Sequence, residues 1–412
     1  MNISSYQKTQ LDNGITVISE HIPHVRSVSI GVWLRTGTRF EDKSVNGVAH
    51  FLEHMMFKAT RKRTAREIVR RIESLGGNLN AFTAKEQTCY HIEILDEHLS
   101  KAIDVLADVL CREDFPEKEF EKERQVILDE IQSAEDTPDE VVLEYFATKM
   151  FPDHALGNPI LGVEDTINAM TMDEMMAFYR STYTADRTVI AVAGHLQHNK
   201  LVAQVQQKFN FPQNISNPVK LSRPKSFGAG FHQLERPVFQ SHLCIGVPGI
   251  AYDDPAKWDL LIMNTILGDG MGSRLFQNIR ERYGIAYAIF SFAELYHDCG
   301  VFGVYLGTDQ RNIPKAQKML VNELDKISSK PVSQRELRDA KSYTKGNIML
   351  RLENTSSRMN RLAMLEIYNG KFQPIDHVIT QIEQVSRESI MATASRLLSP
   401  ERRLTVILSP NK

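Results

Sequence analysis

The sequence predicts an α+β protein of two homologous domains, each a mostly antiparallel sheet packed with α-helices. The chain has 412 residues, more than one ordinary hydrophobic core accommodates. Strand-like apolar runs are mixed with long amphipathic helical patterns. The same order of elements occurs twice, on either side of a segment rich in proline and glycine. Together these observations indicate an internal duplication.

A segment at 208–237 separates the two copies. It shows little periodicity and holds several turn-forming residues, namely Pro212, Pro218, Pro224, Gly228, Gly230 and Pro237. Such composition is typical of an interdomain linker. We therefore expect an N-terminal domain over 1–215, a linker over 216–232 and a C-terminal domain over 233–412.

The N-terminal copy begins with a strand-like run at 27–34, followed by an apolar helix that carries His50. A helix, a glycine and a strand pair follow at 66–94, and a long amphipathic helix at 116–133. The copy closes with a helix at 171–183 and a strand at 187–193. The C-terminal copy repeats this order at 241–247, 258–267, 274–306, 333–352, 386–398 and 403–408. The repeated order predicts two domains of one design.

Composition excludes several classes of function. A hydrophobic content of 42%, a charged content of 24% and a net charge of −2 fit a globular chain without a nucleic-acid-binding surface. The four cysteines are far apart, which is neither a disulfide framework nor a zinc knuckle and favours a reducing compartment: Cys89, Cys111, Cys244 and Cys299. Residues 1–20 hold no apolar signal core, and no run of 18 apolar residues occurs. We expect a cytoplasmic protein with no membrane span.

His50, Glu53 and His54 form the most informative motif of the chain. On a helix these three side chains share one face. Two imidazoles one turn apart can bind one metal ion, and the carboxylate beside them can take a proton from water, as in the H-x-x-E-H form of a zinc site. Solvated histidines are the alternative, but the surrounding residues are apolar and predict a largely buried helix. The corresponding segment of the second copy, 263–267, lacks the motif, so only the first domain can be catalytic.

The spacing alone leaves the third metal ligand open. The helix at 120–133 offers four carboxylates, any of which could be a solvated surface group: Glu121, Glu123, Asp129 and Glu130. Glu123 and Glu130 are seven residues apart and therefore lie on one face. If Glu130 binds the metal, Glu123 is placed to hydrogen-bond a ligating imidazole.

With these motifs, the chain resembles the inverzincin metallopeptidases, the family of pitrilysin, insulin-degrading enzyme and mitochondrial processing peptidase, and most of all its short, two-domain bacterial branch. The segment 47–57 resembles the family's metal helix, and 76–83 its substrate-binding edge strand. The resemblance covers nearly the whole chain. It implies Glu130 as the third ligand, 76 positions after His54, and one zinc ion per subunit. Glu123 would then orient an imidazole.

The resemblance implies a zinc metalloendopeptidase. Two imidazoles and a carboxylate leave a fourth position for water, as a catalytic zinc site requires. Zinc would lower the pKa of that water to about 7, and Glu53 would take its proton and return it to the leaving amine. Peptides would bind as an extended strand along 77–84, with Asn80 and Ala81 at the contact, although this could be an ordinary edge strand. Phe57 would line the pocket just after the cut, or be simple core.

Further residues are implied at the substrate. Arg280 and Tyr287, seven apart, match the pair with which larger relatives hold the substrate and its developing oxyanion. Taken alone they could be a surface helix residue and a core strand residue. Glu140 and Glu144 lie where processing peptidases hold an arginine just upstream of the cut, and could equally be a solvated helix face. The loop at 267–273 is rich in glycine but is not a phosphate-binding loop.

These implications together describe an endopeptidase for small or unfolded peptides that acts inside a closed chamber, in precursor processing or in peptide clearance. Longer relatives fuse two such chain lengths, so a two-domain chain should form a homodimer in which the partner subunit completes each active site. The alternative is a non-catalytic scaffold or a peptide-binding subunit of the same fold. The intact His50, Glu53, His54 and Glu130 argue against that alternative.

Overall fold

The computed structural model describes residues 5–111, 114–211 and 221–411, so part of the predicted linker at 216–232 lies outside the described residues. The chain forms two compact units. Unit 1 contains Met1–Gln132, Asn158–Leu221 and Leu350–Phe372. Unit 2 contains Ser133–Gly157, Ser222–Met349 and Gln373–Lys412. Each unit therefore includes one segment from the other half of the sequence.

Unit 1 is built on a six-stranded sheet in the order β1-β2-β6-β3-β5-β4. Its strands are β1 (Ser5–Gln10), β2 (Thr16–His21), β3 (Ser27–Leu34), β4 (Asn78–Thr83), β5 (Thr88–Leu95) and β6 (Thr188–Gly194). All neighbours are antiparallel except β2 and β6, which run parallel. β4 lies at one edge, as the family resemblance implies for this segment.

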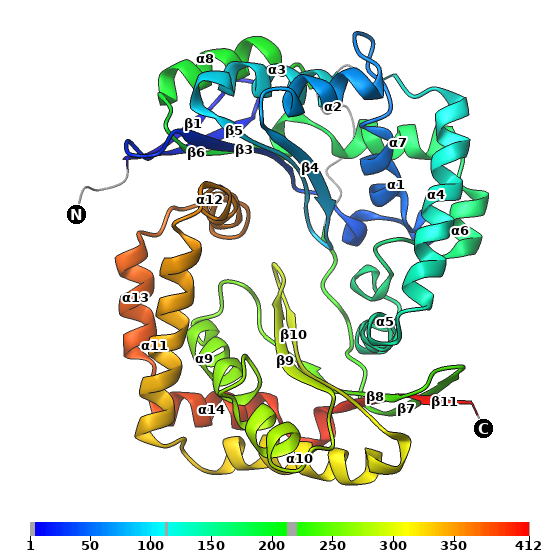
Figure 1. Cartoon of the computed structure of the whole chain (residues 1–412), viewed down its shortest axis with the longest axis vertical. Helices are drawn as coiled ribbons and strands as arrows, with labels where there is room; N and C mark the ends of the chain where they lie inside the picture. The colour runs from blue at the N-terminus through cyan, green and yellow to red at the C-terminus, as the bar shows by residue number, and fades with distance from the viewer. Residues whose placement is uncertain (1–4, 112–113, 212–220, 412) are drawn as a thin grey trace. The chain divides into compact units, whose positions relative to one another are not determined.

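Helices cover both faces of the unit 1 sheet. They are α1 (Val48–Met55), α2 (Ala65–Glu73), α3 (Leu99–Cys111), most of α4 (Glu117–Glu135), α6 (Glu164–Ala169), α7 (Met172–Thr182), α8 (His198–Lys208) and α12 (Thr355–Asn369). Figure 1 shows α2, α3 and α8 on one face and α12 on the other, where it contacts β2, β3 and β6. Strand β6 is buried along its whole length because both of its faces are covered.

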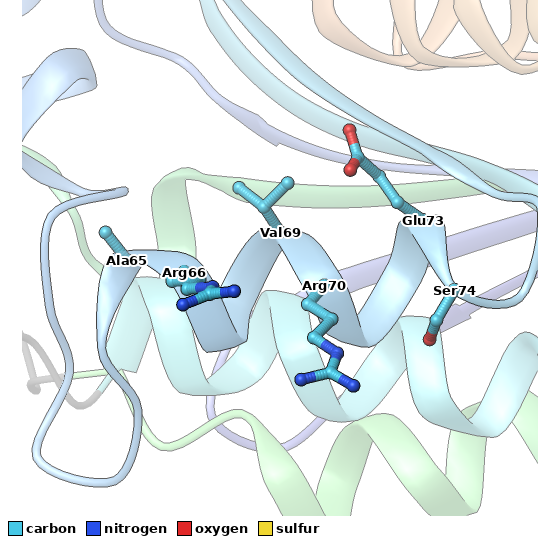
Figure 2. Close-up of a pocket in the computed structure, with 6 residues that line it drawn as sticks. All are labelled: Ala65, Arg66, Val69, Arg70, Glu73 and Ser74. Atoms are coloured by element: carbon cyan, nitrogen blue, oxygen red, sulfur yellow. The ribbon is translucent and has the colours of Figure 1, made fainter.

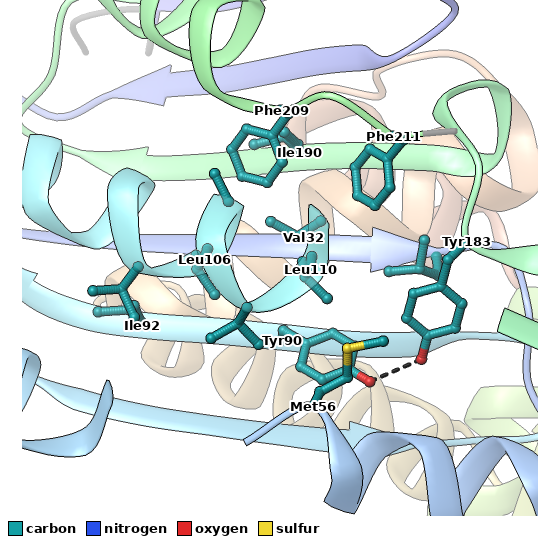
Figure 3. Packing of buried hydrophobic residues seen from close by; sticks show 14 of the residues in the cluster. Val32, Met56, Tyr90, Ile92, Leu106, Leu110, Tyr183, Ile190, Phe209 and Phe211 are labelled. Carbon is teal, nitrogen blue, oxygen red and sulfur yellow. Dashed lines mark hydrogen bonds between the residues drawn. The ribbon is translucent and has the colours of Figure 1, made fainter. Parts of the chain in front are cut away.

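The main core of unit 1 lies between the sheet and the helices on the face that α3 covers. Figure 3 shows apolar side chains from several strands and helices packed together there, among them Val32, Leu106, Leu110 and Phe209. Two polar atoms in this core are paired, since the Tyr90 and Tyr183 hydroxyls are 2.8 Å apart. This core forms the support beneath α1, whose apolar residues belong to the same cluster.

Unit 2 repeats the design with five strands in the order β7-β11-β8-β10-β9. They are β7 (Gly230–Arg236), β8 (Ser241–Pro248), β9 (Ala288–Leu295), β10 (Gly300–Thr308) and β11 (Leu404–Pro410). The pair β7 and β11 is parallel and the others are antiparallel, as in unit 1 once β1 is set aside. The predicted α+β class, with mostly antiparallel sheets related by duplication, is confirmed.

The helices of unit 2 also cover both faces of its sheet. They are α5 (Pro138–Met150), α9 (Lys257–Leu267), α10 (Ile313–Ser329), most of α11 (Gln334–Arg351), α13 (Ile375–Gln384) and α14 (Arg387–Leu397). α5 packs on β8 and β11, and Figure 1 shows it on the face opposite α10 and α14. The compact units thus cross the predicted division of the chain at α5 and α12. Among the helices of the described residues, none combines the length and apolar character needed to cross a membrane.

Candidate metal centre

Helix α1 carries the histidine motif, and a carboxylate that precedes the helix by seven residues accepts hydrogen bonds from its first N–H groups. Gly47, before the first helical residue, has a φ of 95°, which glycine adopts without the strain of a side chain. Buried Glu41 accepts hydrogen bonds from the backbone N–H of Gly47 (2.9 Å) and of Ala49 (2.8 Å). Burial raises the pKa of Glu41 to about 7, against the opposing effect of these donors and of Asn46. The carboxylate thereby accepts from backbone N–H groups that have no partner within the helix, as at the start of any helix.

His50, His54 and Glu130 come together in the structure. Each offers one ligand atom, and these atoms lie within 4.8 Å of one another. The Nε2 atoms of both imidazoles are 3.7 Å from Oε2 of Glu130. Ligands on one tetrahedral zinc ion are separated by about 3.4 Å, given metal–ligand distances near 2.1 Å. The three groups therefore fit zinc by donor type and by spacing.

The electrostatics keep His50 ready to bind a metal. Burial and the neighbouring charge of His54 lower the pKa of His50 to about 4, so its imidazole is neutral at neutral pH. Its Nδ1 atom is buried and has no hydrogen-bond partner among the described residues. A neutral imidazole leaves a nitrogen lone pair for a metal ion.

His54 is oriented by a second carboxylate of α4. Its Nδ1 atom lies 3.1 Å from Oε2 of Glu123, so an Nδ1–H donated to that oxygen leaves the Nε2 lone pair facing Glu130. Glu123 is itself buried and paired with Lys58, whose Nζ is 2.6 Å from Oε1. The sequence predicts the role of Glu123, whereas Lys58 was not foreseen. The available signal was a lysine four residues after His54, although α1 ends at Met55 and Lys58 lies in the turn that follows.

Glu53 is hydrogen-bonded to a threonine and is not among the three clustered candidate ligands. Thr83 Oγ1 donates a hydrogen bond of 2.5 Å to Oε2 of Glu53. Burial raises the pKa of Glu53, and the nearby Glu130 adds to this, while Thr83 and His54 oppose it. Thr83 was also not foreseen. Its signal was the alternation of Leu79, Ala81 and Thr83 along one face of the strand.

The two faces of the predicted substrate strand differ in burial. Leu79, Ala81 and Thr83 are partly buried, and Leu79 and Ala81 pack against the core, whereas Asn80 is exposed. Asn80 Oδ1 accepts a hydrogen bond from the Ala81 N–H at 2.8 Å. Phe57 follows α1, is partly buried, and its ring lies 5.8 Å from that of Tyr90. The three predicted substrate-binding residues Phe57, Asn80 and Ala81 belong to unit 1, as do the candidate ligands.

The other predicted site residues belong to unit 2. Arg280 is exposed in the π-helical turn η6 (Phe276–Glu281), with its guanidinium 4.9 Å from the Phe276 ring centroid. Tyr287 is 54% exposed and its N–H donates to Gly307 O. Glu140 and Glu144 are exposed on α5. Their roles in substrate binding stay predictions.

A separate hollow of unit 1 lies along α2. Figure 2 shows its six lining residues, Ala65, Arg66, Val69, Arg70, Glu73 and Ser74. Its volume is about 690 Å³. One side of a single helix supplies the lining, and no predicted site residue is included.

Known proteins match the chain along nearly its whole length. The family model described as "Insulinase (Peptidase family M16)" matches residues 16–164, and the model "Peptidase M16 inactive domain" matches residues 169–343. An uncharacterized zinc protease of Streptomyces coelicolor is 38% identical, over 98% of this chain and 90% of its own. The uncharacterized zinc protease YmxG of Bacillus subtilis is 36% identical, over 96% of each chain.

Solved structures show the same fold. A protease from Helicobacter pylori matches with a TM-score of 0.93 and 22% identity, over 99% of this chain and 100% of that one. A peptidase M16 inactive domain from Pseudomonas fluorescens matches with a TM-score of 0.91 and 20% identity, over 99% and 98%. With relatives above 35% identity across nearly their full length, the chain belongs to the insulinase family of zinc proteases, peptidase family M16.

Proposed function

We propose that this protein is a zinc-dependent endopeptidase whose metal is held by His50, His54 and Glu130, one ion per subunit. The observation that carries the proposal is the convergence of both Nε2 atoms on Glu130 Oε2, each at 3.7 Å. Membership in a family of zinc proteases supports the same reading. When bound, zinc would polarise the scissile carbonyl and activate a water for attack.

Glu53 is the proposed general base. It lies beside His54 in the sequence but is not among the clustered ligand atoms, so its carboxylate is available for proton transfer. Its raised pKa brings the carboxyl group closer to neutral pH, where a group can both accept and return a proton. In this mechanism Glu53 takes the proton of the attacking water and delivers it to the leaving amine.

The edge strand β4 is the proposed substrate platform. It pairs with β5 on one side and ends the sheet on the other. A peptide added as a further strand would be held by main-chain hydrogen bonds with little demand on its sequence, and Asn80 and Ala81 lie in the middle of that strand. Phe57 would line the pocket after the cut. Such binding suits small or unfolded peptides, in precursor processing or in clearance.

The remaining proposed features rest on the family resemblance. Arg280 and Tyr287 would come from the partner subunit of a homodimer, and the two subunits would enclose a chamber. Both side chains are exposed and so are available to a substrate. We also propose a cytoplasmic location and no nucleic-acid or membrane partner.

The test combines a metal assay with one fluorogenic peptide. Wild-type protein should contain zinc and cleave the peptide, and a chelator should remove both properties. Glu53→Gln should abolish turnover with zinc content near normal, because Glu53 is not a ligand. Glu130→Gln should lower both zinc content and turnover. Full activity in Glu53→Gln, or in thoroughly chelated protein, would exclude this mechanism.

A further inference from the structure

Thr83 ends the proposed substrate strand and holds the proposed base. Its side chain lies on the same face of β4 as Leu79 and Ala81, the face against which α1 packs. There its hydroxyl donates to Oε2 of Glu53 at 2.5 Å. This distance is at the short end for an O–H···O⁻ bond, as expected when the acceptor is an ionised carboxylate.

The position of Thr83 is fixed by the turn that follows it. The backbone N–H of Ala84 donates to Gln87 O at 2.8 Å, and its carbonyl accepts from the N–H of Thr38 at 3.2 Å. The approach is close enough that a Cβ at Gly37 would lie 2.1 Å from Ala84 O, so only glycine fits there. Glu86 in the same turn forms a buried ion pair of 2.5 Å with Arg39 in the short helix η1 (Thr38–Phe40). The strand end is therefore anchored independently of Glu53.

A fixed donor restricts what the carboxylate of Glu53 can do. An ionised carboxylate has only acceptor sites, so the Thr83 hydroxyl must donate its single hydrogen to Oε2. Oε1 then remains for the proton of the attacking water. Without the hydroxyl, the carboxylate could rotate about its terminal bond, which has a broad torsional preference.

We infer that Thr83 is a positioning residue that orients Glu53 for proton transfer. Through the same hydrogen bond it fixes the position of the base relative to the strand that would bind the peptide. The inference rests on the proposed function. It links two features that the motif treats separately, because the residue that orients the base is part of the strand beside which the scissile bond would lie. Its loss should therefore slow the chemical step and leave peptide binding intact.

The test is Thr83→Val, which keeps the β-branched shape and removes only the hydroxyl. We expect kcat to fall about 10- to 100-fold, the loss that follows from misplacing a catalytic group by about an ångström. KM and zinc content should stay within about twofold of wild type, the margin we take as no effect. Thr83→Ser, which restores the hydroxyl, should recover most of kcat. If the valine variant does not fold, Thr83→Ala takes its place.

Thr88→Val is the matched control. Thr88 pairs directly with Thr83 across the β4–β5 ladder, and its hydroxyl donates to Thr36 O at 3.0 Å. Its kcat should stay near wild type. As a readout apart from turnover, zinc-free Thr83→Val should bind an uncleavable fluorescent peptide as tightly as the zinc-free wild type.

Two results would overturn the inference: an unchanged kcat in Thr83→Val, or a loss that Thr83→Ser does not rescue. An active Glu53→Gln protein would instead overturn the proposed function itself. The two failures are therefore distinguishable.

Discussion

The Nδ1 atom of His54 lies 3.1 Å from Oε2 of Glu123, although the two residues are 69 positions apart in the sequence. The other oxygen of this carboxylate is paired with Lys58 at 2.6 Å. Glu123 is buried, so both contacts are protected from solvent screening. One carboxylate thus fixes the ring of a candidate ligand and is fixed in turn by a lysine.

Glu123→Gln should weaken zinc binding about 10- to 100-fold, the usual effect of altering the hydrogen-bond partner of a ligating histidine, because the amide lacks the negative charge that His54 and Lys58 face. Competition with a chromogenic chelator measures the affinity. Glu121→Gln, on the exposed side of the same helix, is the control and should bind zinc as wild type does. Equal affinities in all three proteins would contradict the orienting role of Glu123.

The zinc-free protein should lose stability as pH falls from about 6.5 to about 4. His50 has a pKa of about 4 in the folded protein, below its ordinary 6.5. In this window the unfolded chain binds a proton that the folded protein does not, so the free energy of unfolding decreases with falling pH, by at most about 3 kcal/mol. Urea unfolding of chelated wild type and His50→Gln gives the measurement. An equally steep pH dependence in His50→Gln would refute the assignment.

Met359→Ala should destabilise unit 1 by about 2–5 kcal/mol. Met359 is fully buried on α12, with its sulfur 3.4 Å from Nε1 of Trp33 in β3. The substitution leaves a cavity between the helix and the sheet. Met349→Ala removes a 44% exposed methionine and should cost less than about 0.5 kcal/mol. Denaturant unfolding compares them, and similar small losses would show that α12 contributes little to this unit.

Two inactive proteins should restore activity when mixed, if the active site is completed by the partner subunit. Glu53→Gln lacks the base, and Arg280→Ala lacks the proposed substrate-holding group. Under conditions of subunit exchange, a mixed dimer has one site with both residues intact. Peptide turnover should therefore return. Absence of recovery despite demonstrated exchange would eliminate completion in trans.

Peptides with arginine two residues before the scissile bond should be preferred. Glu140 and Glu144 are four apart and both exposed on α5, so they can jointly accept one guanidinium group. Each charge-assisted contact would contribute roughly 1.5–3 kcal/mol. Comparing kcat/KM for arginine and alanine peptides, in wild type and in Glu140→Gln/Glu144→Gln, measures this. A preference that survives the double substitution would discard these residues.

The sequence by itself determined the repeated order of elements and the local motif. Strand periodicity, helix periodicity and the spacing of His50, Glu53 and His54 are short-range properties, so they can be read along the chain. The strand over 27–34 and the helix after 116 were predicted in this way, whereas the edge strand near 78 was implied by the family resemblance. The closing strand at 187–193 was also predicted, and the structure shows that β6 is buried along its whole length.

Only the tertiary structure decided what covers those faces and what surrounds the motif. α12 covers the sheet of unit 1 and α5 that of unit 2, although each helix comes from the other half of the sequence. The contacts of Lys58 with Glu123 and of Thr83 with Glu53 likewise join residues far apart in the sequence, so periodicity could place these side chains on a face but could not pair them. A hydrogen bond depends on where two atoms meet in space, and periodicity describes only the face on which a side chain lies.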